Sequence, residues 1–441
     1  MTTTRIDNGR VYVDGDLQPL SILLDGERIA ALYHPDLAPN IAADEVIDAT
    51  GCWLLPAGID MHVHISDGAE TFSPGSRCAA AGGIGTVLDM APFHGCVTPE
   101  QFQAKVEAAG AAYVVDFGLV AGIVVSLEDL PHLAELADLG APYFKVFMPG
   151  QPPVTPEVLW QAVQAAGETG LRLGLHAEES GCLAEVDWDD PLGFAHARPI
   201  AAESSATAQV LEMARAAGAP VHICHVSSVQ TAELIAEAKD RGVDVTAEIP
   251  MHFLLFDENE FLRQGARVKT TPPLRPEGHQ ALLWQALNEG VIDVLACDHF
   301  LGTLDEVPTD PAQMQDAAAG IASLELSLPL LFSDGVQEGK LDLARFVEAT
   351  AEWPAEIAGL ASRKGRIAVG LDADFVFFDP QAEWQVAPQG AFSRNANSPY
   401  LGRQLQGRIT RTMLRGQTVW DGEQILVEDG YGQHIRSREQ N

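Results

Sequence analysis

Two histidines separated by a single residue follow an apolar run near the start of the chain. His62 and His64 close the stretch LLPAGIDMHVH. Side chains at positions i and i+2 of a β-strand point to the same face, so we expect these two imidazoles to aim together. A lone buried histidine is usually a hydrogen-bonded core residue. Two on one face at a strand end make metal ligation the competing interpretation, because imidazole is a common metal ligand.

Three more apolar runs carry polar residues at or near their ends. LRLGLH ends in His176, PVHICH ends in His225, and IDVLACDH contains Asp298. Each residue taken alone could be a strand-ending polar group that meets solvent. Four imidazoles and one carboxylate together form a ligand set that suits zinc and similar ions. His222 lies at an odd offset from His225, on the opposite face of the strand, so we interpret it as structural.

A lysine stands inside another apolar run. Lys145 is the third residue of YFKVFM, and burying its charged head is costly unless the head is paired. In one interpretation the ammonium reaches solvent at the strand end. In the other, burial lowers its pKa, the neutral amine captures CO2, and the resulting carbamate bridges two metal ions. Spacing alone does not decide between the two.

The elements that must position these residues are eight strand-like runs that alternate with helical stretches. The intervening stretches, such as PEVLWQAVQAAGETG, have helical spacing and end in glycine. This alternation predicts a (β/α)8 TIM barrel, whose active sites lie at the C-terminal ends of the strands. An open doubly wound sheet is the alternative, but its G-x-G-x-x-G motif after the first strand is absent. The runs are residues 52–62, 85–90, 114–121, 143–148, 171–176, 220–225, 243–249 and 292–299.

The two ends of the chain have a different sequence pattern from the middle. They are made of short runs that alternate apolar and polar residues, as in RVYVDG and GRIAVGLDADFVFFDP. We therefore predict a small β-sandwich domain built from residues 1–55 and 360–441, with the barrel spanning 56–359.

Composition limits the partners that the chain could have. Of 441 residues 46% are hydrophobic, and the formal net charge is −35. Such a surface repels nucleic acid and anionic membranes, so we expect neither as a partner. The six cysteines are scattered without a C-x-x-C pair, which favours reduced thiols. We see no signal peptide and no membrane-spanning run, and we expect a cytoplasmic protein.

Several motifs together resemble the cyclic amidohydrolases of the amidohydrolase superfamily, a group that holds dihydroorotases, hydantoinases or dihydropyrimidinases, and allantoinases. They are PAGIDMHVH, FKVF, LHAEE, HICHVSS, CDH and KGRIAVGLDADFVFFDP, and the resemblance runs over nearly the whole chain. HICHVSS and NSPYLGRQLQGRITRTMLRG are most similar to allantoinases.

The resemblance implies a role for each candidate residue. His62, His64 and Asp298 would hold one divalent metal ion, His176 and His225 a second, and carbamylated Lys145 would bridge them. Zinc is the first expectation, with manganese, cobalt or iron as alternatives. A metal-bound hydroxide would attack the amide carbonyl of a cyclic substrate, and Asp298 would pass the proton to the leaving nitrogen. The group also implies a homodimer or homotetramer.

Other positions bear on which ring is opened. Ser66 stands where dihydroorotases carry an arginine, Gly150 where hydantoinases carry a tyrosine, and Ala319 where hydantoinases carry an asparagine. The loop SDGAETFSPGSR also departs from the EPGR loop of allantoinases. A neutral, allantoin-like ring is the first expectation. The alternatives are a hydantoinase-, dihydropyrimidinase- or dihydroorotase-type ring, or another cyclic ureide, imide or lactam.

Further residues have weaker motif matches. Thr271 in TTPPLR matches a position whose backbone touches the cyclic amide, although a plain loop explains it equally. We interpret His252 as structural, and we expect Glu178 and Glu179 to begin a helix.

Two other function classes compete with ring opening. One is a non-catalytic, dihydropyrimidinase-like scaffold, but all six ligand positions keep suitable side chains. The other is a different amidohydrolase reaction, such as deamination or deacetylation, which Lys145 and the HVSS and PPLR segments argue against.

Overall fold

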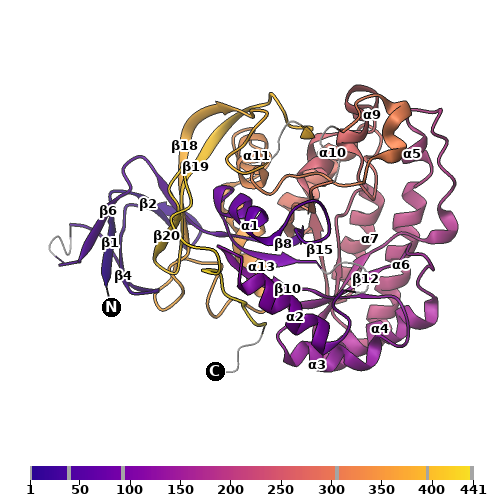
Figure 1. Cartoon of the computed structure of the whole chain (residues 1–441), viewed down its shortest axis with the longest axis horizontal. Coiled ribbons are helices and arrows are strands. Elements are labelled where there is room, and N and C mark those ends of the chain that lie inside the picture. Colours follow the sequence, from indigo (N-terminus) through magenta and orange to yellow (C-terminus); the bar gives the residue numbers. More distant parts are fainter. Residues whose placement is uncertain (1, 37–40, 91–94, 303–306, 394–396, 438–441) are drawn as a thin grey trace.

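The structure is a computed structural model that describes residues 2–36, 41–90, 95–302, 307–393 and 397–437. Two sheets lie at one side of the molecule, and a ring of strands wrapped by helices makes up the rest (Figure 1). Within the described residues, no helix is both long and apolar enough to cross a membrane.

The ring is a barrel of parallel strands, as predicted. One of its sheets has the order β10-β9-β8-β17 and the other the order β11-β12-β13-β14-β15-β16. Only Val120 separates β10 from β11, and only residues 296–298 separate β16 from β17, so the two sheets join into one closed ring. The strands are β8 (Gly58–His64), β9 (Ile84–Asp89), β10 (Asp116–Leu119), β11 (Ala121–Val124), β12 (Tyr143–Phe147), β13 (Arg172–His176), β14 (Val221–Ile223), β15 (Val245–Ile249), β16 (Val294–Leu295) and β17 (His299–Phe300).

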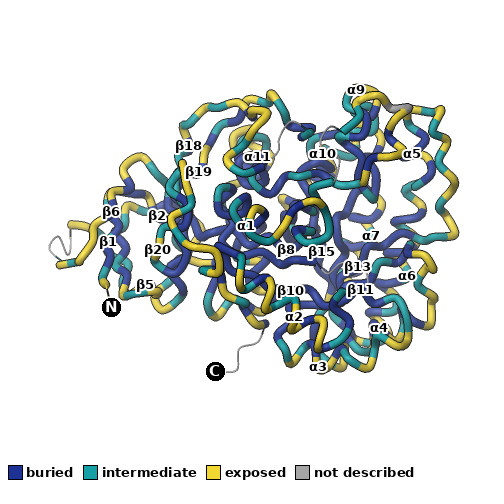
Figure 2. The backbone as a smooth tube through the Cα atoms, in the orientation of Figure 1, coloured by how far each residue is buried: buried dark blue, intermediate teal, exposed yellow. Residues whose placement is uncertain are grey.

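Helices cover the outside of the barrel and begin and end at expected signals. Thr98 and Thr155 each cap a helix that starts with proline, and Gly170 ends one with φ 64°. The barrel strands are buried, while the outer faces of the helices are exposed (Figure 2). The longer helices are α1 (Phe72–Ala81), α2 (Pro99–Gly110), α4 (Pro156–Thr169), α6 (Ile200–Ala217), α7 (Val229–Asp240) and α10 (His279–Asn288). The shorter ones are α3 (Leu133–Asp138), α5 (Gly193–His196), α8 (Met251–Leu255), α9 (Glu260–Gln264), α11 (Ser327–Leu331), α12 (Leu343–Val347) and α13 (Trp353–Ile357). Short 3₁₀ and π turns are η1 (Leu130–His132), η2 (Ser180–Cys182), η3 (Gly265–Val268), η4 (Pro311–Asp316), η5 (Phe332–Val336) and η6 (Glu348–Glu352).

The remaining strands form two sheets that bring the two ends of the chain together. One has the order β5-β4-β1-β6 and the other the order β20-β19-β18-β7-β2-β3. Apolar side chains from both, among them Ile6, Leu54 and Phe375, share one core cluster. The strands are β1 (Thr3–Asp7), β2 (Arg10–Val13), β3 (Asp16–Gln18), β4 (Ser21–Asp25), β5 (Arg28–Tyr33), β6 (Glu45–Asp48), β7 (Trp53–Pro56), β18 (Phe375–Gln385), β19 (Gln404–Leu414) and β20 (Gln417–Trp420).

The first predicted run, residues 52–62, is two strands rather than one. Its first part is β7, which pairs with β2 and β18, and its second part is β8, the first barrel strand. The apolar pattern hides this division because both parts are buried. We propose that residues 1–55 and 360–441 form the β domain and that residues 56–359 form the barrel. Residues 1, 37–40, 91–94, 303–306, 394–396 and 438–441 lie outside the described residues.

A buried ionic cluster links the barrel to the C-terminal part of the chain. Asp116 begins β10, and its carboxylate lies 2.8 Å from Lys364 Nζ and also pairs with Arg415. Asp374 pairs with Lys364 and accepts a 2.7 Å hydrogen bond from the Arg415 backbone N–H. Burial alone would raise the pKa of Asp116, but Lys364 and Arg415 lower it. The cluster therefore keeps opposite charges paired inside the protein, where unpaired charges would be strongly destabilising.

Candidate metal centre

All the candidate residues line one pocket at the carboxyl ends of the barrel strands. The pocket has a volume of about 320 Å³. A larger groove of about 1290 Å³ lies on the outside of α3 and α4, and its lining includes none of the candidates. The pocket is lined by His62, His64, Asp67, Met90, Ile123, Lys145, Phe147, His176, His225, Thr271, Asp298, Phe300, Ala319 and Gly320.

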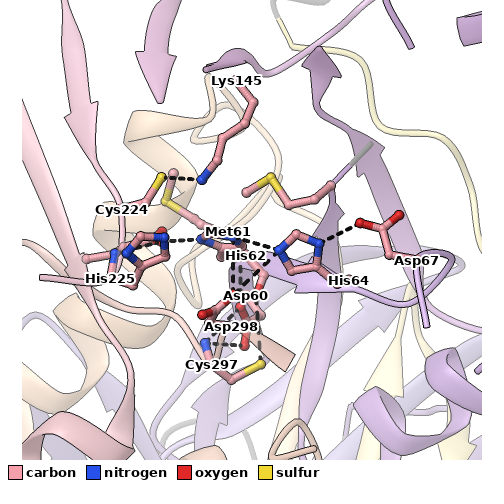
Figure 3. Close-up of polar contacts among 12 residues, drawn as sticks. Asp60, Met61, His62, His64, Asp67, Lys145, Cys224, His225, Cys297 and Asp298 are labelled. Carbon is pink, nitrogen blue, oxygen red and sulfur yellow. Dashed lines mark hydrogen bonds and ion pairs between the residues drawn. The ribbon is translucent and has the colours of Figure 1, made fainter. Parts of the chain in front are cut away.

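His62, His64 and Asp298 point toward one another (Figure 3). The two Nε2 atoms lie 3.1 Å apart. Asp298 Oδ1 lies 3.4 Å from His62 Nε2 and 3.5 Å from His64 Nε2. Two nitrogens and a carboxylate oxygen therefore surround one point, which is the arrangement that a divalent ion requires.

The other nitrogen of each imidazole is held by a carboxylate. His62 Nδ1 contacts Glu248, and His64 Nδ1 lies 2.7 Å from Asp67 Oδ2. A carboxylate accepts the Nδ1 proton, which leaves the lone pair on Nε2. The two Nε2 lone pairs then face each other at 3.1 Å, and a cation between them would satisfy both. The donor set fits a metal ion for this reason.

A second group of candidate ligands lies beside the first. The ring centroids of His176 and His225 are 4.5 Å apart, and those of His62 and His225 are 5.4 Å apart. Nδ1 of His225 is buried and has no hydrogen-bond partner among the described residues. Lys145 is only 3% exposed, and its Nζ donates to Cys224 Sγ at 2.9 Å (Figure 3). The ammonium of Lys145 therefore does not reach solvent.

Two of the candidate ligands have unusual backbone conformations. His225 has φ 39° and Asp298 has φ 49°. Both follow a barrel strand rather than ending it, because β14 stops at Ile223 and β16 at Leu295. Side-chain-bearing residues rarely adopt positive φ, and such strain concentrates at functional sites. The geometry supports a functional role for these two side chains.

Burial and neighbouring charged groups set the ionisation states of the candidate metal ligands. Burial lowers the pKa of His62, His176 and His225, so these imidazoles are neutral at neutral pH. Burial alone would raise the pKa of Asp298, but the neighbouring His62 and His64 lower it. Neutral imidazoles and an ionised carboxylate are the forms that bind a cation.

Glu248 in β15 is a site residue that sequence reasoning missed. Besides His62, it accepts a 3.2 Å hydrogen bond from the His225 backbone N–H and contacts His222 Nε2 at 3.0 Å. Its pKa, which burial would raise, is lowered well below the ordinary range by His62 and His222. The signal was available, since a glutamate inside the apolar run VDVTAEI must have buried partners.

The expectation that Glu178 begins a helix is wrong. Its side chain is fully buried and lies 2.6 Å from His176 Nε2 and 3.1 Å from Arg198 Nε. Burial alone would raise the pKa of Glu178, but His176 and Arg198 lower it to about 2. Glu179 instead caps the short turn η2. Glu178 therefore orients His176 in the way that Glu248 orients His62.

His222 and His252 do not line the pocket. His222 is buried and holds Thr246 Oγ1 at 2.8 Å in addition to Glu248. His252 is buried without a hydrogen-bond partner among the described residues, and burial lowers its pKa to about 4.

The chain is similar to known proteins over nearly its whole length. The model of the amidohydrolase family matches residues 53–419. The chain belongs to the amidohydrolase family. It is similar to an allantoinase from Escherichia coli O139:H28, with 32% identity over 99% of both chains. An allantoinase from Salmonella newport is 31% identical over 99% of both chains.

Solved structures of amidohydrolases share the same architecture. The dihydropyrimidinase from Brevibacillus agri superposes with a TM-score of 0.90 at 29% identity, over 99% of each chain. The L-hydantoinase from Arthrobacter aurescens gives a TM-score of 0.90 at 29% identity, over 99% of this chain and 100% of that one. These likenesses confirm the barrel and the cyclic amidohydrolase group that the motifs indicated. The chain is a cyclic amidohydrolase, and its described residues include groups that could hold a metal ion.

Proposed function

We propose that this cyclic amidohydrolase opens a neutral cyclic ureide of the allantoin type. The observation that carries the proposal is the convergence of His62 Nε2, His64 Nε2 and an Asp298 oxygen in a small pocket. The similarity to allantoinases over 99% of the chain supports the choice of ring.

The lining of the pocket favours an uncharged substrate. Among its described lining residues, Lys145 is the sole lysine or arginine, and its amine contacts Cys224. A substrate carboxylate would therefore have no guanidinium to pair with. Ser66 Oγ, at the position where dihydroorotases carry arginine, instead lies 3.5 Å from Asp89 Oδ2.

We propose that His62, His64 and Asp298 would hold one divalent ion and that His176 and His225 would hold a second, with carbamylated Lys145 as a ligand that both would share. Zinc is the first choice, and manganese, cobalt or iron the alternatives. A divalent ion lowers the pKa of water toward about 7 and polarises an amide carbonyl.

Residues of the chain would then transfer the proton and bind the ring. Asp298 accepts the proton that the attacking water loses and delivers it to the ring nitrogen as the C–N bond breaks. The water oxygen ends on the carbonyl carbon, so the product is a ureido acid. Thr271 borders the same pocket, and we propose that its backbone binds the ring. We further propose a cytoplasmic homodimer or homotetramer.

A hydantoin- or dihydropyrimidine-type ring is the second candidate. The structural similarity to a dihydropyrimidinase and to hydantoinases supports it. Four apolar side chains of the pocket, those of Met90, Ile123, Phe147 and Phe300, would suit a ring with an apolar substituent.

A ring-opening screen with zinc-loaded protein tests the proposal. The substrates are allantoin, hydantoin, 5-substituted hydantoins, dihydrouracil, dihydroorotate and succinimide. We expect the highest kcat/KM for allantoin, and a higher value for hydantoins would favour the second candidate. Dihydroorotate as the best substrate would contradict the neutral pocket, and the inactive variant Asp298→Asn serves as the blank.

A further inference from the structure

The segment 269–275, KTTPPLR, carries Thr271 into the pocket and has a buried cation at each end. Lys269 is 6% exposed and Arg275 is 3% exposed. Arg275 has a conventional anionic partner, because its Nη2 lies 3.0 Å from Glu203 Oε2 and its Nε lies 2.8 Å from Ser227 Oγ. That end of the segment is therefore fixed to α6 and to the turn after β14.

Lys269 is bound differently. Its Nζ donates to the backbone carbonyls of Met314 at 2.8 Å and Ala317 at 2.6 Å, and no carboxylate of the described residues lies within ion-pair distance. The ammonium lies 5.1 Å from the ring centroid of Trp188 and 5.2 Å from that of Phe194. Aromatic faces and carbonyl oxygens stabilise a desolvated cation without a counter-ion. Lys269 therefore joins three separate segments of the chain at one point.

The loop 314–320, which contains both carbonyls that Lys269 Nζ binds, also contacts the backbone of Lys269. The Gly320 N–H donates to the Lys269 carbonyl at 2.8 Å. A Cβ added to Gly320 would meet the Phe300 ring at 2.6 Å, so this loop is packed directly against another pocket residue. Ala319, Gly320 and Phe300 all line the pocket together with Thr271. Lys269 thus connects two walls of the pocket, one at Thr271 and one at Ala319 and Gly320.

We propose that Lys269 is a positioning residue that sets the separation between these two walls and hence the fit of the substrate ring. Without its ammonium, two buried carbonyls lose their donor and the loop 314–320 is free to move away from Thr271. The metal ligands lie on other segments, so the effect falls on substrate binding. The substrate part of this inference depends on the proposed function.

The first test needs no substrate. Amide hydrogen exchange is measured on wild type, on Lys269→Met and on Lys340→Met, a control lysine that lies over the Trp284 ring outside the pocket lining. We expect exchange in residues 314–322 to rise at least about 10-fold in Lys269→Met alone. Unchanged exchange in that variant would overturn the proposal.

The second test distinguishes a positioning role of Lys269 from a purely structural role. With allantoin and hydantoin as paired substrates, Lys269→Met should raise KM about 10-fold and change kcat less than about 3-fold, with unchanged zinc content. Lys269→Arg keeps a cation for the carbonyls and rings and should recover most of the wild-type KM. Faster exchange with an unchanged KM, or no recovery in Lys269→Arg, would make Lys269 a structural residue only. A wild type that opens no ring would instead reject the proposed function, and the exchange experiment would still decide the role of the loop.

Discussion

The orientation of three of the four imidazoles in the pocket is decided by a carboxylate from a neighbouring strand or loop. Glu248 holds His62, Asp67 holds His64, and Glu178 holds His176. Each contact fixes which ring nitrogen is protonated and therefore which lone pair is available to a metal.

Removing the charge of Glu248 should weaken metal binding without removing a ligand. Glu248→Gln keeps the shape of the side chain, but a neutral amide holds the His62 Nδ1 proton less strongly. We expect zinc affinity, measured by competition with a chromogenic chelator, to fall about 10- to 100-fold. The control is Glu260→Gln, which alters a pair with Arg263 outside the pocket lining. Equal zinc affinity in wild type and Glu248→Gln would contradict the orienting role.

The candidate ligands could be predicted from the sequence because their own spacing relates them to strand ends. His62 and His64 share a strand face, and a single strand is enough to see it. Glu248 and Asp67 could not be found in that way. The partner of Glu248, His62, stands on another strand, whereas Asp67 contacts His64 three residues earlier in the chain but lies beyond the strand end. Asp67 also stands in a loop, where no periodicity fixes the direction of a side chain.

At the scale of elements, the long strand β19 depends on a glycine. Gly407 has φ 90°, and a Cβ there would lie 2.5 Å from both Phe332 and Phe378. Both rings belong to the core that joins the strand to the barrel side, so they cannot move aside freely.

Gly407→Ala should therefore destabilise the protein by more than the cost of placing alanine at a positive φ angle. Gly370 has nearly the same φ, 92°, but a Cβ there would meet nothing within 4 Å. We expect Gly370→Ala to lower the free energy of unfolding by about 1 kcal/mol and Gly407→Ala by about 3 kcal/mol. Equilibrium urea unfolding measures both. Equal losses would show that the aromatic contacts carry no extra energy.

Element types were predicted more successfully than element boundaries. The alternation of apolar runs and helical stretches gives the barrel, because parallel strands are buried on both faces and read as apolar runs. The division between β7 and β8 was missed, since neither apolar pattern nor length marks where the chain passes from one sheet to the other. The sequence predicts His225 and Asp298 at strand ends, whereas both follow the last residue of their strand and have positive φ angles.

At the scale of the whole molecule, the barrel and the C-terminal segments are held together partly by the buried cluster of Asp116, Lys364, Asp374 and Arg415. The chain carries a net charge of −35, so a buried lysine shared among Asp116, Asp372 and Asp374 also limits repulsion between carboxylates. The cluster could not be predicted from the sequence, because Asp116 is far along the chain from Lys364, Asp374 and Arg415.

Lys364→Met should be strongly destabilising. The variant fills a similar volume but leaves Asp116 and Asp374 with one buried cation fewer. We expect the free energy of unfolding to fall by about 3–5 kcal/mol. The control Arg366→Met removes an exposed pair with Glu356, in which the closest N–O distance is 3.8 Å, and should cost less than about 0.5 kcal/mol. A small effect of Lys364→Met in thermal or urea unfolding would mean that the cluster is not a main link between the two parts.

The most direct test of the whole account is anomalous X-ray diffraction from zinc-loaded crystals at the zinc absorption edge. We predict two anomalous peaks in the pocket, one within about 2.3 Å of His62 Nε2, His64 Nε2 and an Asp298 oxygen, and one beside His176 and His225. Added electron density on Lys145 Nζ should lie between them. Zinc bound elsewhere, with no peak among these residues, would contradict the central claim.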